Sequence, residues 1–369
     1  MEITVERDLL LTALKTVAPG VSAKSTLPIL ACVKLETRGE VLSLATTNLD
    51  LSMCTELPAS IAKSGTAVVD HALLGAVIEK MRAGTVTLIV DEHKSEVVTV
   101  QSDDGTVRLK GVPADEFAAM PVVLTENTST VAISPEWFKR AVSSVAFAAT
   151  DDDTRPTLTG VYLVGAGEQV TLAATNGFML AQWQGETAVS WPDVKANLPA
   201  RYLKDIIRVM EPTSITFNCE LVVFESTSAR AVLRTLEGRY PDYAEIIKPP
   251  AASVLHAQKS ELSIACGLAL VIAVNKDAST KMTYEPGTLV LEAAFSGRGE
   301  NASLCRATVE GDAPVTPVAL SAHLMNDIIT HVPGQEVVVR SPNSGMEPII
   351  FQCADDPAWL AVQMPMISG

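Results

Sequence analysis

The chain has 369 residues, of which 47% are apolar and 19% are charged, and its formal net charge is −15 with a pI of about 4.8. This length predicts two or three domains, and the apolar content excludes a largely disordered chain. Taken alone, the negative charge argues against a nucleic-acid-binding protein.

The N-terminus and the cysteines give no sign of export. The first ten residues, MEITVERDLL, lack the basic start and apolar middle of a signal peptide. The longest apolar run, Gly267 to Val274, is far shorter than the roughly 20 residues of a membrane helix, and it predicts a buried helix. No two of the six cysteines form a CxxC pair, which is typical of reduced core cysteines rather than a zinc or thioredoxin site. We therefore expect a cytoplasmic protein.

Two kinds of helical segment each occur three times along the chain. The first kind carries an acidic residue in its first turn, and its copies are residues 6–17, 134–145 and 259–270. The second kind has apolar residues five, eight, nine and twelve positions after an apolar anchor, so they share one helical face. Its copies are residues 68–81, 197–210 and 319–332, with anchors Val69, Leu198 and Leu320. The pairing of the two kinds indicates an internal repeat.

Between these helices the apolar residues follow a period of two, the pattern of strands. Examples are VLSLATTNLDLSM, VTLIVDEHKSEVVTV, RAVLRTL, TLVLEAAFS, EVVVRS and PIIFQCA. We predict an α+β fold built from three similar units with antiparallel sheets, in which each helix covers one sheet face. The predicted domains are residues 1–125, 126–250 and 251–369, with the stretch KPPAASV at 248–254 as a linker.

Basic residues recur on the helix faces opposite the apolar stripes. They are Lys15, Lys139, Arg140, Arg201, Lys204 and Arg208. Each could be an ordinary solvated side chain, but their recurrence in an acidic protein also fits a local surface for phosphate groups. The third repeat differs, because its second helix offers His323 and His331 but neither Lys nor Arg.

The sequence contains no recognisable catalytic constellation. It has no Walker loop, no GxGxxG and no HExxH, and its five histidines are dispersed. The stretch TDDDTR at 150–155 could hold a divalent ion, or it could be a polar loop in which Arg155 balances the carboxylates. The stretch SGRGENAS at 296–303 predicts a loop rather than a phosphate cradle. We expect no catalytic residue, no metal site and no cofactor.

Several stretches together resemble the bacterial DNA polymerase III β subunit, the sliding clamp. They are TLPILACVKLE, TTNLDLSM, TRPTLTGVYL, AATNGFMLA, LEGRYPDYAEII and VQMPM, in the order and spacing of that family. The resemblance implies a non-enzymatic processivity factor with three clamp-type domains per chain. It also implies a head-to-tail homodimer that forms a ring, with sheets outside and helices lining the hole around duplex DNA. The six basic helix residues would then face DNA without reading its sequence, as would Lys24.

The resemblance further implies a pocket for short apolar motifs of the polymerase, the clamp loader and repair proteins. Its expected lining is Leu158, Thr175, Gly177, Phe178, Met179, Leu180, Pro241, Ile246, Met346, Val362, Met364, Pro365 and Met366. The apolar end of the chain, AVQMPMISG, would belong to this pocket instead of packing only on its own domain. The expected dimer contact joins Val107 and Leu109 of one copy to Ile272 and Ala273 of the other.

The chain departs from the family pattern at several of these positions. Phe178 and Met179 stand where the family has a histidine and an arginine, and Glu245 stands where an arginine is common. We expect a pocket rim with less positive charge. Ala273 is smaller than the usual leucine, which predicts a ring that opens more easily. Two alternatives are not excluded by the sequence. One is a specialised clamp, such as a mobile-element or inhibitor-resistant copy. The other is a clamp-derived scaffold that binds peptides without encircling DNA. A metabolite-processing enzyme has no motif in its favour.

Overall fold

The computed structural model describes residues 1–22, 26–90, 97–118, 120–121, 128–247, 253–273, 279–311, 317–342 and 347–366. The chain forms two compact units. Unit 1 consists of residues 1–138 and 204–235, and unit 2 consists of residues 139–203 and 236–369. Within the described residues, no helix is long and apolar enough to cross a membrane.

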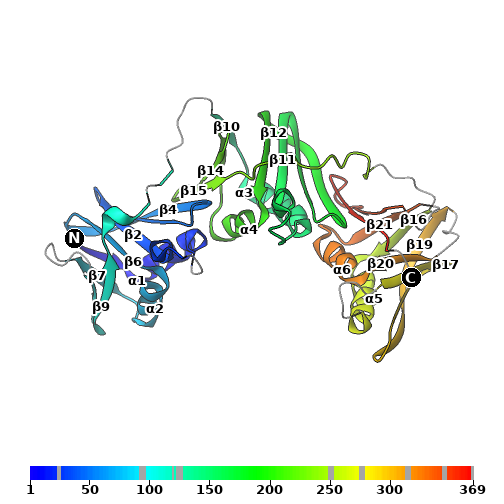
Figure 1. The fold of residues 1–369 in the computed structure, drawn as a ribbon, viewed down its shortest axis with the longest axis horizontal. Helices are drawn as coiled ribbons and strands as arrows, with labels where there is room; N and C mark the ends of the chain where they lie inside the picture. Colours follow the sequence, from blue (N-terminus) through cyan, green and yellow to red (C-terminus); the bar gives the residue numbers. More distant parts are fainter. Residues whose placement is uncertain are drawn as a thin grey trace. The chain divides into compact units, whose positions relative to one another are not determined.

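Unit 1 is built on one antiparallel sheet of thirteen strands in the order β10-β13-β14-β15-β4-β3-β2-β6-β9-β8-β7-β1-β5. The strands are β1 (Glu2–Glu6), β2 (Cys32–Arg38), β3 (Val41–Thr47), β4 (Leu51–Pro58), β5 (Ser60–Lys63), β6 (Thr66–Asp70), β7 (Thr85–Val90), β8 (Val97–Ser102), β9 (Gly105–Val112), β10 (Ser129–Ala132), β13 (Ser214–Phe217), β14 (Leu221–Glu225) and β15 (Ala229–Arg234). Helices α1 (Arg7–Val17) and α2 (His71–Lys80) lie side by side against the sheet (Figure 1).

Unit 2 is built on ten strands in the order β11-β12-β23-β22-β21-β16-β19-β18-β17-β20, all paired antiparallel. They are β11 (Gly160–Thr175), β12 (Met179–Pro199), β16 (Ser253–Gln258), β17 (Ser279–Glu285), β18 (Thr288–Phe295), β19 (Gly299–Gly311), β20 (Val318–Ser321), β21 (Glu336–Ser341), β22 (Ile349–Cys353) and β23 (Trp359–Gln363). Helices α5 (Lys259–Ile272) and α6 (Ala322–His331) pack on each other, and α5 covers β18 and β19 (Figure 1).

The helical periodicity of the sequence is confirmed at all six predicted positions. Helices α3 (Pro135–Val145) and α4 (Ala200–Val209) complete the set. The α2 start shows why sequence reasoning works here: the Asp70 side chain accepts a hydrogen bond from the backbone N–H of Leu73 at 2.7 Å, which caps the helix. In α2, Leu74 and Ile78 are buried and lie four residues apart on one face.

The predicted stretch 41–53 contains a turn that its period-two pattern conceals. Strand β3 ends at Thr47 and β4 begins at Leu51, and the two pair as a hairpin. The Asn48 side chain accepts hydrogen bonds from the backbone N–H groups of Asp50 and Leu51, and Leu49 has a φ of 79°. A non-glycine residue rarely adopts that conformation, so the local polar contacts of Asn48 override the strand propensity around it.

Candidate partner-peptide site and nucleic-acid-facing helices

The expected peptide pocket is centred on two neighbouring strands of unit 2. Leu180 of β12 lies opposite Val362 of β23, and both are almost fully buried, at 3% and 1% exposure. With Ile350 of β22 they form an apolar cluster, against which Tyr243 and Ile247 pack. Thus residues from distant parts of the sequence meet here because β12, β23 and β22 are adjacent in the sheet.

A tight turn between β11 and β12 presents the most exposed apolar side chain of this region. The Asn176 side chain accepts hydrogen bonds from the backbone N–H groups of Phe178 and Met179, both at 2.9 Å. Gly177 has a φ of 91°, which glycine adopts without strain. The turn holds the Phe178 ring outward, with 62% of its surface exposed.

Hydrogen bonds tie the apolar end of the chain to this turn. The backbone N–H of Met364 donates to the Phe178 carbonyl at 2.9 Å, and the N–H of Met366 donates to the Ala319 carbonyl at 2.8 Å. The buried side chain of Gln363, between them, donates from Nε2 to the Ser321 carbonyl. Met364 therefore has a fixed backbone while its side chain stays 37% exposed.

The lining residues separate into a buried floor and an exposed rim. Thr175, Met179, Leu180 and Val362 are buried, and Leu158, Pro365 and Met366 are partly buried. The exposed residues are Gly177, Phe178, Pro241, Ile246 and Met364. Met346 lies outside the described residues.

The expectation that Met179 forms part of the rim is wrong. Its side chain is only 4% exposed, because β12 pairs with β11 on one side and with β23 on the other. An arginine placed there would have to bury its charge, which is unfavourable without a partner.

Arg155 is a rim residue that sequence reasoning did not include. Its Nη1 donates to the Asn176 carbonyl at 3.0 Å, and its Nε lies 3.1 Å from Asp152 Oδ2. Asp152 also accepts from the backbone and hydroxyl of Thr154, and these bonds together with Arg155 hold the pKa of its carboxyl below the usual value. The rim therefore keeps one cation beside the turn, and the stretch 150–155 forms the polar loop that was one of its two interpretations.

Tyr243 and Ile247 were also missed, although the stretch containing them was noted. Residues 244–247 form turns rather than a helix, so no helical period marks this pair in the sequence. Burial raises the pKa of Tyr243 to about 12. The neighbouring Tyr240 ring stacks on Tyr162 with centroids 4.7 Å apart. This aromatic packing anchors the segment that covers the Leu180–Val362 floor.

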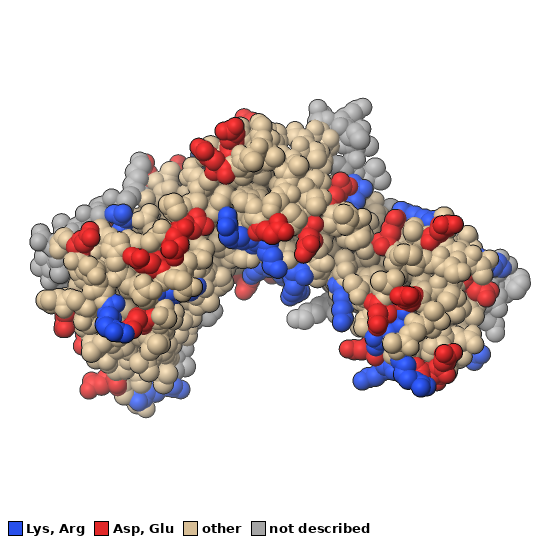
Figure 2. Space-filling view, turned by 180° about the vertical axis from the view of Figure 1, so that it is seen from behind, with Lys and Arg blue, Asp and Glu red and all other residues tan. Residues whose placement is uncertain are grey.

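The basic residues expected to face DNA are exposed wherever the structure describes them. They are Lys15 on α1, Lys139 and Arg140 on α3, and Arg201, Lys204 and Arg208 on α4; Lys24 lies outside the described residues. Arg208 is paired with Asp205 at 2.6 Å, so part of its charge is neutralised. Arg201 lies over the Tyr202 ring, 4.4 Å from its centroid. On the face that Figure 2 draws, blue basic side chains are interspersed with red acidic ones.

The outward face of α5 is apolar where α3 and α4 are basic. Ile264, Leu268 and Val271 recur at helical spacing and are 65%, 52% and 65% exposed. Lys259, at the start of the helix, is held by the carbonyls of Thr330 and Val332. The described helices of the third repeat thus offer little charge to a phosphate backbone.

Two strands have an edge that no described strand of their own unit occupies. Residues 105–110 of β9 pair with β8 only, while Gly111 and Val112 reach β6. Residues 299–306 of β19 pair with β18 only, while residues 307–311 pair with β16. Val107 on β9 is 37% exposed. Open edges of this length are templates for pairing with another chain.

Ala273, which is expected to take part in a dimer contact, is buried in its own unit. Ala273 is 2% exposed and packs with Ala269, Ala293 and Ala322 in the core of its own unit. A small side chain fits this cluster of alanines between α5, α6 and β18, and the easily opened ring stays a prediction. Leu109 is buried within unit 1, Ile272 is partly buried, and Val271 is the exposed apolar residue at this helix end.

No metal site accompanies these surfaces in the described part of the chain. Within those residues, no group of three or more His, Cys, Asp and Glu side chains is placed to hold a metal ion.

Comparisons with known proteins agree over the whole chain. A family model described as "DNA polymerase III beta subunit, N-terminal domain" matches residues 1–121, and one described as its central domain matches residues 132–242, together more than half of the chain. The beta sliding clamp of Synechocystis sp. is 26% identical over 379 residues, covering 95% of each chain. That of Streptomyces coelicolor is 29% identical over 326 residues, covering 85% of this chain and 84% of the relative.

Solved structures have the same fold at low identity. The beta subunit from the DNA polymerase of Streptococcus pyogenes has a TM-score of 0.92 at 19% identity, and Caulobacter crescentus pol III beta has 0.89 at 24% identity. Each match covers 100% of both chains. The chain belongs to the DNA polymerase III beta subunit family, the non-enzymatic sliding clamps of bacterial DNA replication.

Proposed function

We propose that this protein is a DNA sliding clamp that encircles duplex DNA as a homodimeric ring and tethers the replicative polymerase. The observation that carries the proposal is the match to curated beta sliding clamps over as much as 99% of the chain. A ring that is held on DNA by its topology needs only weak, sequence-independent contacts, which the exposed basic residues of α3 and α4 can supply.

The open edges of β9 and β19 are the surfaces that close the ring. In a head-to-tail dimer, residues 105–110 of one copy pair antiparallel with residues 299–306 of the other, and each edge satisfies the other's backbone groups. Charge supports this pairing, because Arg108 and Lys110 are exposed on β9 and Glu300 is exposed on β19. Val107, half covered in one copy, becomes buried on closure.

The rim of exposed Phe178, Ile246 and Met364 is the docking surface for partner peptides. Clustered exposed apolar side chains mark interaction sites, and flexible Met side chains accommodate several partners. The described surface favours peptides with apolar anchors, and Asp152 already neutralises part of the charge of Arg155 beside the turn. A solved clamp of C. crescentus is described as carrying polyethylene glycol at its beta-motif tethering region.

One observation favours a second candidate, a clamp-derived scaffold that binds peptides without enclosing DNA. The outward face of α5 is apolar and the outward face of α6 carries Asp327, so the third repeat opposes rather than attracts phosphate. In the leading proposal, the attraction of the basic residues of the other repeats for DNA phosphates exceeds the repulsion by this face.

Primer extension on a long single-stranded circular template tests the function. The host polymerase III core and clamp loader should make much longer products per binding event when this protein is added. The result would favour the scaffold if this protein left the product length unchanged while another clamp, loaded by the same clamp loader, lengthened the products.

A further inference from the structure

A cavity of about 320 Å³ lies on the sheet of unit 1, away from every surface described above. Strands β2, β3, β4 and β15 form its floor, and its roof comes from Ala114, Asp115, Phe117, Ala118, Met120 and Pro121. Its lining residues are Lys34, Glu36, Arg38, Ser43, Ala45, Cys54, Ala114, Asp115, Phe117, Ala118, Met120, Pro121, Arg230 and Val232. The volume is at the lower end of the range for small-molecule sites.

Strand register explains why a hollow exists at this place. Lys34, Ala45, Cys54 and Arg230 occupy one cross-strand row on four adjacent strands. Neighbouring strands are about 4.8 Å apart, so the two long basic side chains are separated by two small residues. The short side chains of Ala45 and Cys54 leave space above the sheet, and the longer side chains of Lys34 and Arg230 border that space on either side.

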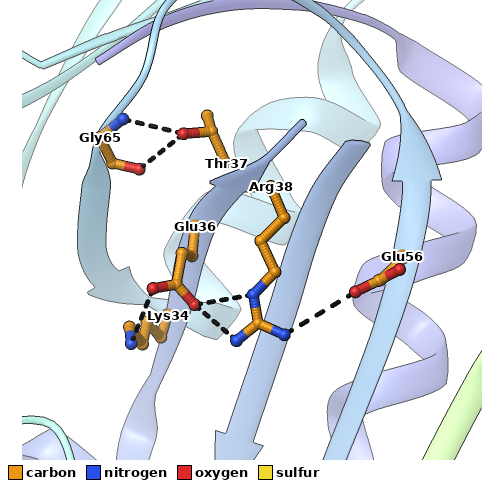
Figure 3. Close-up of polar contacts among 6 residues, drawn as sticks. All are labelled: Lys34, Glu36, Thr37, Arg38, Glu56 and Gly65. Carbon is orange, nitrogen blue, oxygen red and sulfur yellow. Dashed lines mark hydrogen bonds and ion pairs between the residues drawn. The ribbon is translucent and has the colours of Figure 1, made fainter. Parts of the chain in front are cut away.

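The three basic side chains of the lining have carboxylate partners at unequal distances. Glu36 accepts two hydrogen bonds from Arg38, at 2.8 and 3.2 Å, as Figure 3 shows. Lys34 approaches Glu36 only to 3.6 Å, beyond hydrogen-bonding distance. The lining holds three basic and two acidic residues, so it is net positive in a chain of net charge −15.

Arg230 has a carboxylate neighbour but keeps one donor without a hydrogen bond. Its Nε atom is shielded from solvent and has no hydrogen-bond acceptor, and the Glu225 carboxylate lies 3.5 Å away. A buried donor without an acceptor costs free energy that a bound acceptor would recover.

Apart from Asp115, the roof is apolar. Phe117, Met120 and Pro121 line the cavity together with Ala45 and Val232 of the floor. A ligand that fits both features carries one oxyanion and a compact apolar body.

We propose that this cavity binds a small organic anion, a carboxylate or a phosphate monoester with an apolar ring. Arg230 and Lys34 hold the anionic group, and the ring lies over Ala45 and Cys54 beneath Phe117 and Met120. Asp115 at the roof disfavours ligands with several negative charges.

Cys54 makes the test direct, because its thiol lines the cavity while the exposed Cys219 lies outside it. Burial raises the pKa of the Cys54 thiol, so the alkylation is run at mildly alkaline pH. The full-length protein is treated with iodoacetamide, and both cysteines are followed by peptide mass spectrometry. Indole-3-acetate and phenyl phosphate are the two anionic probes, and indole-3-acetamide is the neutral control.

We expect at least one anionic probe to slow alkylation of Cys54 at least about tenfold at saturation, with Cys219 unchanged. The probe that protects identifies the anion as carboxylate or phosphate. Protection by neither probe, or equal protection by the neutral amide, would overturn the proposal.

Two variants test the anion contacts by titration calorimetry. Arg230→Gln and Lys34→Gln should each weaken binding of the protecting probe about tenfold or more, since each removes a charge-assisted hydrogen bond. Arg234→Gln is the matched control, because Arg234 lies on the same strand, outside the cavity, and pairs with Glu220. Thermal unfolding shows whether each variant is folded. If Arg230→Gln is not folded, the affinity of Lys34→Gln alone tests the anion contacts. Affinities equal to that of the control would contradict the assignment.

Discussion

At the scale of single residues, the turn at Asn176–Phe178 decides how the peptide site is presented. The resemblance predicts its lining from local motif letters, and this lining stays a prediction. It could not assign exposure correctly at Met179 and Ala273, because burial depends on which strands and helices pack on them. Arg155 was missed for the same reason, since its contact with Asn176 joins positions 21 residues apart.

Phe178→Ala should weaken capture of an apolar clamp-binding peptide by roughly 1–2 kcal/mol, because it removes the largest exposed side chain of the rim. The free energy of unfolding should change by less than about 0.5 kcal/mol, since the ring is exposed. Fluorescence anisotropy with a labelled peptide measures the affinity. Ile264→Ala, a comparably exposed residue on α5, is the control, and equal affinities for both variants would remove Phe178 from the site.

The Glu36 carboxylate is expected to contribute to the free energy of unfolding of unit 1 in a pH-dependent way. The hydrogen bond from Arg38 is the largest cause that lowers the pKa of the Glu36 carboxyl, followed among the favourable contacts by the charge of Lys34. A lowered pKa stabilises the fold above the unfolded-state pKa, and the effect is lost as pH falls through the folded-state pKa.

Glu36→Gln should therefore destabilise the protein at pH 7, by less than about 1 kcal/mol for a partly exposed pair, and have no effect at strongly acidic pH. Urea unfolding at several pH values measures the difference, with Glu40→Gln in the nearby turn as the control. A destabilisation that persists unchanged in acid would show that the carboxylate charge is not its cause.

At the scale of elements, helices were more predictable than strands. All six helices follow from the 3.6-residue period, and each predicted segment lies within three residues of the observed ends. The turn inside residues 41–53 and the two open edges depend on pairing between strands, which alternation along one strand cannot reveal.

Helix α4 carries a prediction for DNA contact. Replacing Arg201, Lys204 and Arg208 together by Ala should lower loading onto nicked circular DNA at moderate salt, because each lost phosphate contact weakens the salt-dependent attraction. Arg208→Ala alone should have less effect than Lys204→Ala, since Asp205 already neutralises Arg208. Lys195→Ala, Arg234→Ala and Arg239→Ala together remove the same charge from exposed positions outside the helices. Equal losses for both triple variants would mean that only total charge matters.

The open edge of β9 carries a prediction for ring closure. Val107→Asp should shift the protein toward monomers, because closure would bury an unpaired carboxylate. Sedimentation equilibrium measures the dimer fraction, and Thr106→Asp, its neighbour on the opposite face of the strand, is the control for added charge. A dimer as stable as the wild type would place the interface elsewhere.

At the scale of the whole molecule, the repeated α+β architecture was predictable because two kinds of helical segment each recur three times along the sequence. The net charge alone pointed away from DNA, and the distribution of charge on α3 and α4 reverses that conclusion. The central claim is a ring that encloses DNA. It requires the open edge of β9 in each copy to pair with the open edge of β19 in the other.

Retention on DNA before and after linearisation tests this claim most directly. The protein is loaded by its clamp loader onto nicked circular duplex DNA, washed in high salt, and half of the sample is cut once with a restriction enzyme. A topological ring should stay on the intact circle and be lost from the cut molecule, because salt screens the weak contacts but cannot open the enclosure. Equal retention on both forms, or loss from both, would contradict a ring that encircles DNA.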